Sequence, residues 1–178
     1  MIQKTTLILI NLIFGSLVLL SYYNGLNQQP ELSSKLWGGV PTIIRPFIVG
    51  SMFVSAFGFF FFTYNFLVNA DVDKTLFLGR FNYWTLHLMY LLVLIPSMLW
   101  IDFTFKYMLS GTSFDWIVVV ATLFCVALAS IFLFLFTIDM KSDGNTFIYL
   151  ASVVGVSFFT FHTLFLDFLV WTIFYHRG

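Results

Sequence analysis

Two histidines and one aspartate lie inside long apolar stretches of this chain, where ionisable side chains are costly. His87 falls in the stretch 76–101, and both His162 and Asp167 fall in the stretch 147–175. A carboxylate well inside a membrane span costs on the order of 3 kcal/mol on insertion scales, so Asp167 must find a donor, take up a proton or face a wet cavity. Its position about two turns before the predicted helix end allows a second interpretation, in which the carboxylate reaches the headgroups.

Two buried imidazoles on two helices are the arrangement that holds a haem b iron from both sides. If their helices run parallel, His87 and His162 differ in depth by about 7 Å. There is one such pair and no supporting spacing, and a hydrogen bond to a neighbouring hydroxyl explains each histidine equally well. A haem or another porphyrin is therefore one candidate cofactor, and the alternative is that none is bound.

Hydrogen-bonding side chains also share one face of the third apolar stretch. At 100° per residue, a sector of about 80° holds Tyr83, His87, Tyr90 and Ser97. Pro96 interrupts the backbone hydrogen bonds beside Ser97 and frees carbonyl groups for a neighbouring helix or a ligand. This face is either one wall of a ligand pocket or a satisfied polar seam between helices.

The residue patterns of common enzymes are missing from the sequence. Glutamate occurs once, at Glu31, and there is no HExxH, GxSxG or DxxD pattern and no lysine inside a predicted span. There is also no filter-like loop and no ring of charges on one helix, as a channel would need. A non-catalytic role is therefore favoured over an enzyme.

The composition is that of a protein whose solvent is lipid. Hydrophobic residues make up 60% of the chain and charged residues only 9%, whereas a soluble domain carries about 25% charged residues. The formal net charge is zero, so there is no electrostatic case for nucleic acid as a partner. The single cysteine, Cys125, forms no intrachain disulfide and has no metal-ligand spacing around it.

Five apolar stretches reach the roughly 20 residues that a helix needs to cross a bilayer. They cover residues 5–23, 43–68, 76–101, 116–138 and 147–175. We expect an all-α integral membrane protein, a single multi-pass bundle of five transmembrane helices with short loops except a long first loop at 24–42. Short connections predict that consecutive helices are antiparallel neighbours. Lys and Arg divide four against four between the two sides, so neither orientation nor host membrane follows.

Two of the predicted helices have a small or polar face opposite a phenylalanine face. In the second stretch, one sector of about 80° holds Ser51, Ser55, Gly58, Phe62 and Asn65, and the opposite side holds Phe53 and Phe60. In the fifth stretch, the two faces are Ser152, Thr160, Thr163 and Asp167 against Phe158, Phe161, Phe165 and Phe168. Helix interfaces in lipid favour small and hydroxyl residues, so the phenylalanine faces should meet lipid. The Ser/Gly stripe also permits a homodimer.

Scattered motifs along the chain resemble the translocator protein / tryptophan-rich sensory protein (TspO/MBR) family, whose members are five-helix membrane proteins of similar length with one long loop after the first helix. Tyr22-Tyr23 stands at the family's Trp-Tyr motif, with Leu26 at the following leucine. In the third helix, Ser97 stands at the family's Asn and Trp100 at its Trp. In the last helix, Tyr149-Leu150-Ala151 is similar to the family's Tyr-Leu-Ala segment.

The resemblance implies a ligand cavity between the helices, covered by the loop 24–42 as a lid. Prolines would stiffen this loop, and Gly38-Gly39 would let it turn beside Trp37. The implied ligands are tetrapyrroles or sterol-like lipids, which suit an apolar cavity with a few polar groups. The candidate ligand-binding residues are Trp37, His87, Tyr90, Ser97, Trp100 and Asp167. The function expected on this basis is membrane-embedded binding or transport of a flat apolar ligand.

A hypothesis from another class is a small accessory or structural subunit of a larger membrane protein complex. Nearly uncharged chains with short loops suit such assemblies. The phenylalanine faces would then contact other subunits, and the first loop would dock a partner. The partners under consideration are thus the lipid bilayer, a small apolar ligand and the subunits of a membrane complex.

Overall fold

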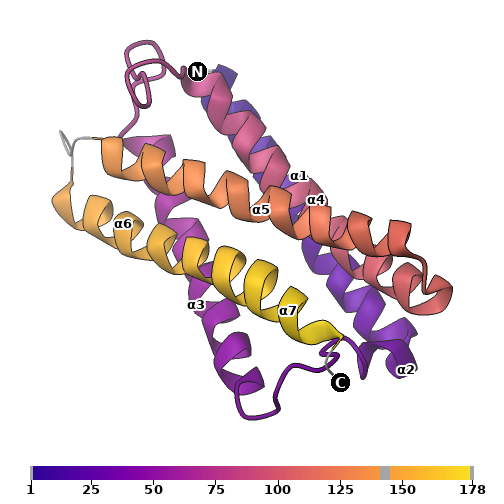
Figure 1. Cartoon of the computed structure of the whole chain (residues 1–178). Helices are drawn as coiled ribbons and strands as arrows, with labels where there is room; N and C mark the ends of the chain where they lie inside the picture. Colours follow the sequence, from indigo (N-terminus) through magenta and orange to yellow (C-terminus); the bar gives the residue numbers. More distant parts are fainter. Residues whose placement is uncertain (1, 141–144, 177–178) are drawn as a thin grey trace.

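The computed structural model describes residues 2–140 and 145–176, which fold into helices joined by short connections (Figure 1). Five helical units of this part of the chain are long and apolar enough to cross a membrane. They are α1 (Ile2–Gln28), α3 (Arg45–Val68), α4 (Tyr83–Ser110), α5 (Ser113–Asp139) and a last unit in which α6 (Thr146–Thr160) continues through the π-helical segment η1 (Phe161–Trp171) into α7 (Thr172–Tyr175). The prediction of an all-α five-helix bundle is confirmed for the described residues.

The first loop is shorter than predicted. Helix α1 continues past residue 23 to Gln28, and the short helix α2 (Pro30–Ser33) follows at once. Pro30 stands at the first turn of α2, where its missing N–H has no helical partner to lose. Residues 24–28 are therefore the last turn of α1, in which Gly25 is buried and residues 26–28 are exposed, and the connection between α1 and α3 covers residues 29–44.

The third helix starts later than predicted, at Tyr83 instead of residue 76. Residues 76–81 form a tight turn in which Phe77 and Phe81 pair as an isolated β-bridge, with Leu78 at φ 52° and Gly79 at φ 68°. Asn82 then caps α4 by accepting a hydrogen bond from the backbone N–H of Trp84. Hydropathy contains no information on turns or helix caps. The prediction that residues 76–82 belong to the helix is therefore wrong.

Helix α4 also ends later than predicted, at Ser110 instead of residue 101. The turn to α5 consists of Gly111 and Thr112, and Gly111 takes the left-handed conformation at φ 62°. Lys106 pairs with Asp115 at 2.9 Å across this turn. The charged residues beyond residue 101 therefore lie within the two helices, near their ends: Asp102 is exposed, and Lys106 is paired with Asp115.

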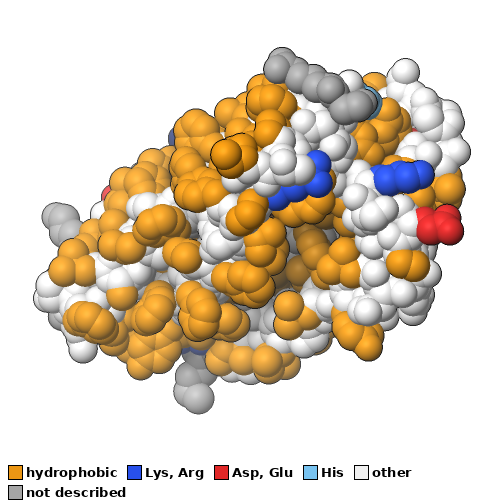
Figure 2. Space-filling view, turned by 90° about the horizontal axis from the view of Figure 1, so that it is seen from below, with side chains coloured by type: hydrophobic (Ala, Val, Ile, Leu, Met, Phe, Trp, Pro, Cys, Tyr) orange, Lys and Arg blue, Asp and Glu red, His pale blue; other side chains and the backbone are white. Residues whose placement is uncertain are grey.

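The helices form an open arc. Helix α1 packs on α4, α4 on α5, α5 on α6 and η1, and α6 on α3. The prediction that consecutive helices are neighbours is confirmed for α4, α5 and α6. It is wrong for α3, which packs chiefly along α6. In Figure 1, α3 diverges from the α1–α4 pair toward the end where the 29–44 connection lies. Viewed from that end, Figure 2 shows a hollow among hydrophobic side chains.

The predicted inward face of α3 is confirmed. Ser51, Ser55, Gly58, Phe62 and Asn65 are all buried, and Phe53 and Phe60 are exposed. A Cβ on Gly58 would lie 2.5 Å from the backbone oxygen of Gly155, so the two backbones touch where α3 crosses α6. Ser55 Oγ donates to the Phe158 carbonyl at 3.1 Å, and Ser152 Oγ donates to the Phe61 carbonyl at 3.0 Å. Small residues and hydroxyls therefore hold this pair of helices together.

Candidate functional site

The structure divides the predicted ligand-binding residues between two buried clusters. Tyr90 belongs to the larger one, which we call the phenylalanine core; it is built around Phe62, Phe66, Phe77 and Phe136. Trp37 and Trp100 belong to a second cluster, which we call the tryptophan end and which includes Trp116, Trp171 and Tyr175. Ser97 is half-buried on α4. Tyr90 is thus in a different cluster from Trp37 and Trp100.

In the phenylalanine core, the polar groups of α4 meet partners on other helices. Tyr90 is fully buried, and its hydroxyl lies 2.7 Å from the Thr63 hydroxyl of α3. The Tyr83 hydroxyl donates to the Phe66 carbonyl at 3.2 Å. Nε2 of His87 lies 2.8 Å from the Gln3 carbonyl oxygen of α1. The two tyrosine hydroxyls and one nitrogen of His87 are thus engaged by the protein, which favours the polar-seam interpretation for this half of the face, although Nδ1 of His87 has no partner among the described residues.

The tryptophan end is a group of large aromatic rings drawn from four long helices. Trp171 of η1 lies edge-on to Trp100 of α4, with ring centroids 5.4 Å apart, and stacks with Trp116 of α5 at 5.9 Å. Tyr22 of α1 stacks on Trp100 at 5.9 Å. The mutual contact of these rings depends on how four helix ends converge.

The 29–44 connection is docked onto this aromatic stack. The Trp171 indole Nε1 donates to the Leu36 carbonyl at 2.8 Å, and the Gly39 N–H donates to the Tyr175 carbonyl at 3.1 Å. Gly38 has φ 47°, and a Cβ there would lie 2.5 Å from the Tyr175 carbonyl oxygen. The expected sharp turn beside Trp37 is present, and only glycine fits it without strain. The connection thus covers the end of the last helix.

His162 and Asp167 form a pair just inside the tryptophan end. Nε2 of His162 lies 3.4 Å from a carboxylate oxygen of Asp167. Residues five apart on an α-helix point about 140° away from each other. In this segment the backbone is π-helical from Phe161 to Trp171, and hydrogen bonds from i to i+5 place residues five apart one above the other. Long π-helical segments are rare and concentrate at functional sites.

Three buried polar atoms in this region have no hydrogen-bond partner among the described residues. They are Nδ1 of His162, whose residue is 6% exposed, Nε1 of Trp100 and Oγ1 of Thr172. Asp167 keeps 36% of its side-chain surface exposed. Unpaired donors beside a reachable acceptor are what a ligand with polar groups requires.

The two histidines have different neighbours. His87 contacts Gln3 in the phenylalanine core, and His162 faces Asp167 near the tryptophan end. Within the described residues, no group of three His, Cys, Asp or Glu side chains converges as metal ligands would. The bis-histidine haem hypothesis gains no geometric support from these contacts.

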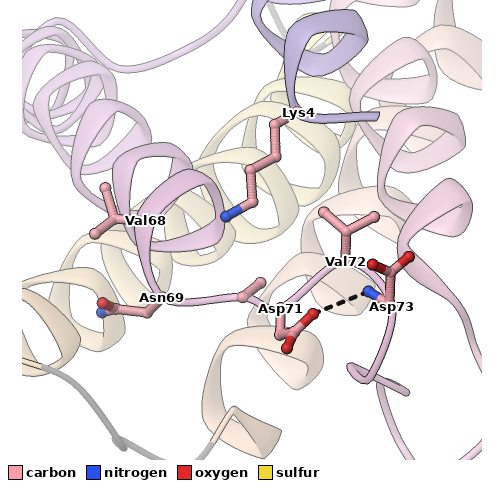
Figure 3. A pocket seen from close by; sticks show the side chains of 7 residues that line it. Lys4, Val68, Asn69, Asp71, Val72 and Asp73 are labelled. Atoms are coloured by element: carbon pink, nitrogen blue, oxygen red, sulfur yellow. Dashed lines mark hydrogen bonds between the residues drawn. The ribbon is translucent and has the colours of Figure 1, made fainter. Parts of the chain in front are cut away.

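An open polar hollow of about 380 Å³ lies at the opposite end of the bundle, between the start of α1 and the turn after α3. Figure 3 shows Lys4 extending over this turn, with Asp71 bonded to the backbone of Asp73. The Asp73 N–H and the Lys74 ammonium, at 3.1 Å and 3.3 Å, hold the pKa of the Asp71 carboxyl below its usual range. These contacts lie within one exposed turn and explain its shape without a ligand.

Sequence reasoning placed Trp100 and Asp167 in the site but missed Tyr22, His162 and Trp171 as their neighbours. The fold and its exposed apolar surface define a bundle with the length and composition of a multi-pass membrane protein. No model of a protein family, no curated protein and no solved structure matches this chain. The resemblance to the translocator protein family therefore stays a prediction.

Proposed function

We propose that this protein binds a small amphiphilic molecule within the membrane, at the inner side of the tryptophan end. The observation that carries the proposal is the Asp167 carboxylate, partly exposed at membrane depth, beside the unpaired Nδ1 of His162 and Nε1 of Trp100. A carboxylate at this depth is retained at a cost of on the order of 3 kcal/mol, which favours a functional role. The rings of Trp100 and Tyr22 supply the apolar surface that such a site needs.

The docked 29–44 connection supports a role as the cover of this site. It is bonded to the last helix through Leu36 and Gly39, next to the rings of the tryptophan end. A covering segment held by a few hydrogen bonds can open at modest cost, since each such bond contributes about 1 kcal/mol. Tetrapyrroles and sterol-like lipids, the ligands implied by the family resemblance, are the first molecules to test.

The test is a binding titration with the protein in lipid nanodiscs. Protoporphyrin IX and cholesterol are titrated while tryptophan fluorescence and thermal unfolding are followed. Binding at the tryptophan end predicts that Trp100→Phe weakens the affinity by roughly tenfold, because the indole N–H and part of the ring surface are lost. Trp84→Phe is the matched control, since Trp84 packs near His87 in the other half of the bundle. Equal weakening in both variants would contradict the proposed location.

An accessory-subunit role is the second candidate, and one surface feature favours it. An apolar groove on the outer side of α3 and α6 is lined by Phe57, Phe60, Phe61, Tyr64, Phe147 and Ile148. Lipid chains fill such a groove as readily as a neighbouring helix does. Gentle purification from the native membrane separates the two roles: co-purifying membrane subunits in fixed ratio support the subunit role, and a homogeneous free protein supports the binding role.

A further inference from the structure

The charge balance around Asp167 defines the chemical class of the ligand more closely; this step builds on the proposed binding function. Among the described residues, Asp167 is paired with no lysine or arginine, and its neighbour in the ion-pair range is His162. The ammonium of Lys106 is paired with Asp115, and the guanidinium of Arg45 bonds to the Val40 carbonyl and lies over the Trp37 ring. The described residues thus offer no fixed positive charge to this carboxylate.

The imidazole of His162 is not a counter-ion for the Asp167 carboxylate, because its neutral form fits this environment. A protonated imidazole has two N–H donors and needs two acceptors. Nε2 of His162 has the Asp167 carboxylate at 3.4 Å, but Nδ1 is buried without a partner. A charged His162 would leave one buried donor unsatisfied, so the neutral imidazole suits this environment better. Asp167 therefore needs a proton or an external cation when it is buried in the membrane.

Aromatic rings about one turn along the last helix from the carboxylate suit a cation as well. Trp171 follows Asp167 by four residues; Trp100 lies edge-on to Trp171, and Tyr22 stacks on Trp100. A cation close to the face of such a ring is attracted by its quadrupole, and Trp is the most effective ring in this role. A carboxylate one helical turn from this group of rings is thus complementary to a positively charged group attached to an apolar body. An anionic ligand would meet repulsion from the same carboxylate.

We propose that the site takes a lipophilic cation, with Asp167 as its counter-ion and the rings of Trp171, Trp100 and Tyr22 as the aromatic surface for its charged head and apolar body. The neutral His162 accepts or donates one hydrogen bond through Nδ1, which selects for a ligand that carries a further polar atom. The class is therefore a protonated or quaternary amine with a hydrophobic body.

The experiment uses three probes with one alkyl chain and different heads: dodecyltrimethylammonium, dodecanol and dodecanoate. Each is titrated against the full chain in nanodiscs of a zwitterionic lipid, and the shift in unfolding temperature and the tryptophan fluorescence are measured. The cation should bind at least roughly tenfold more tightly than the alcohol, and the carboxylate most weakly. Asp167→Asn should abolish the preference for the cation, whereas Asp102→Asn, at an exposed position of α4, should keep it.

The outcomes separate this inference from the proposed function. If dodecanol and the cation bind equally to the wild-type protein, and Trp100→Phe still weakens both, the ligand-binding role stands and the cation class is overturned. If no probe, porphyrin or sterol binds the wild-type protein, both proposals fail. The comparison of the three head groups uses only the wild-type protein, so it tests the preference for a cation even if Asp167→Asn does not fold. Asp167→Glu, which keeps the charge, should preserve the order of the three heads.

Discussion

The phenylalanine core and the tryptophan end are built from the same kinds of residues but treat their polar groups differently. In the core, the hydroxyls of Tyr83 and Tyr90 bond to groups on α3, while Nδ1 of His87 and Nδ2 of Asn65 have no partner among the described residues. At the tryptophan end, a carboxylate faces a single imidazole and the Trp100 indole N–H is unpaired. Unpaired polar atoms therefore occur in both regions, and the regions differ in charge: a carboxylate inside a membrane needs a proton or a cation, whereas an amide or a hydroxyl does not.

The largest expected effect tests the claim that the core carries the stability. Phe66 is fully buried and lies edge-on to Phe77 with centroids 5.7 Å apart. Phe66→Ala should destabilise the fold by about 3–5 kcal/mol through lost contacts and the cavity left behind. Thermal unfolding in nanodiscs measures this, with Phe60→Ala as the control because Phe60 is 70% exposed on the same helix. Similar losses for both variants would remove the distinction between the core and the lipid-facing side.

A smaller effect is expected where the 29–44 connection meets the tryptophan end. Gly38→Ala combines strain at φ 47° with a clash against the Tyr175 carbonyl oxygen, and the strain alone costs about 1–2 kcal/mol. We expect the connection to undock, which trypsin should detect as faster cleavage after Lys35. Gly111→Ala is the matched control, since Gly111 has φ 62° and open space around it. Unchanged cleavage in Gly38→Ala would mean that the connection is held by other contacts.

The smallest effect concerns the exposed carboxylate at the opposite end of the bundle. Asp71 lies in the turn after α3, and bonds from the Asp73 N–H and Lys74 lower its pKa. A carboxyl whose pKa is lower in the folded state stabilises the fold above its usual titration range, and this contribution is lost as the pH falls through the lowered pKa. Wild-type protein should therefore lose slightly more thermal stability on acidification than Asp71→Asn does. Asp73→Asn, which keeps the Asp71 carboxylate, should follow the wild type.

Much of the fold could be predicted from the sequence because it depends on the short-range periodicity of side chains. The 3.6-residue repeat of Ser51, Ser55 and Gly58 identified the buried side of α3, and this side is buried in the structure. Long apolar stretches likewise predicted the five long helices. Helix ends were less accurate, because capping by Asn82 and the left-handed Gly111 are matters of local hydrogen bonding that hydropathy does not contain.

The candidate site required the tertiary structure. His162 and Asp167 point apart on an ideal α-helix, and only the π-helical backbone brings them to 3.4 Å. Tyr22, Trp100 and Trp171 come from the first, third and last long helices, so their contact follows from the way the arc of helices closes at one end. The sequence by itself determined that this chain is a bundle of apolar helices with one carboxylate deep in the last of them. The packing decided which rings and which imidazole surround that carboxylate, because contacts between distant segments depend on helix crossing and register.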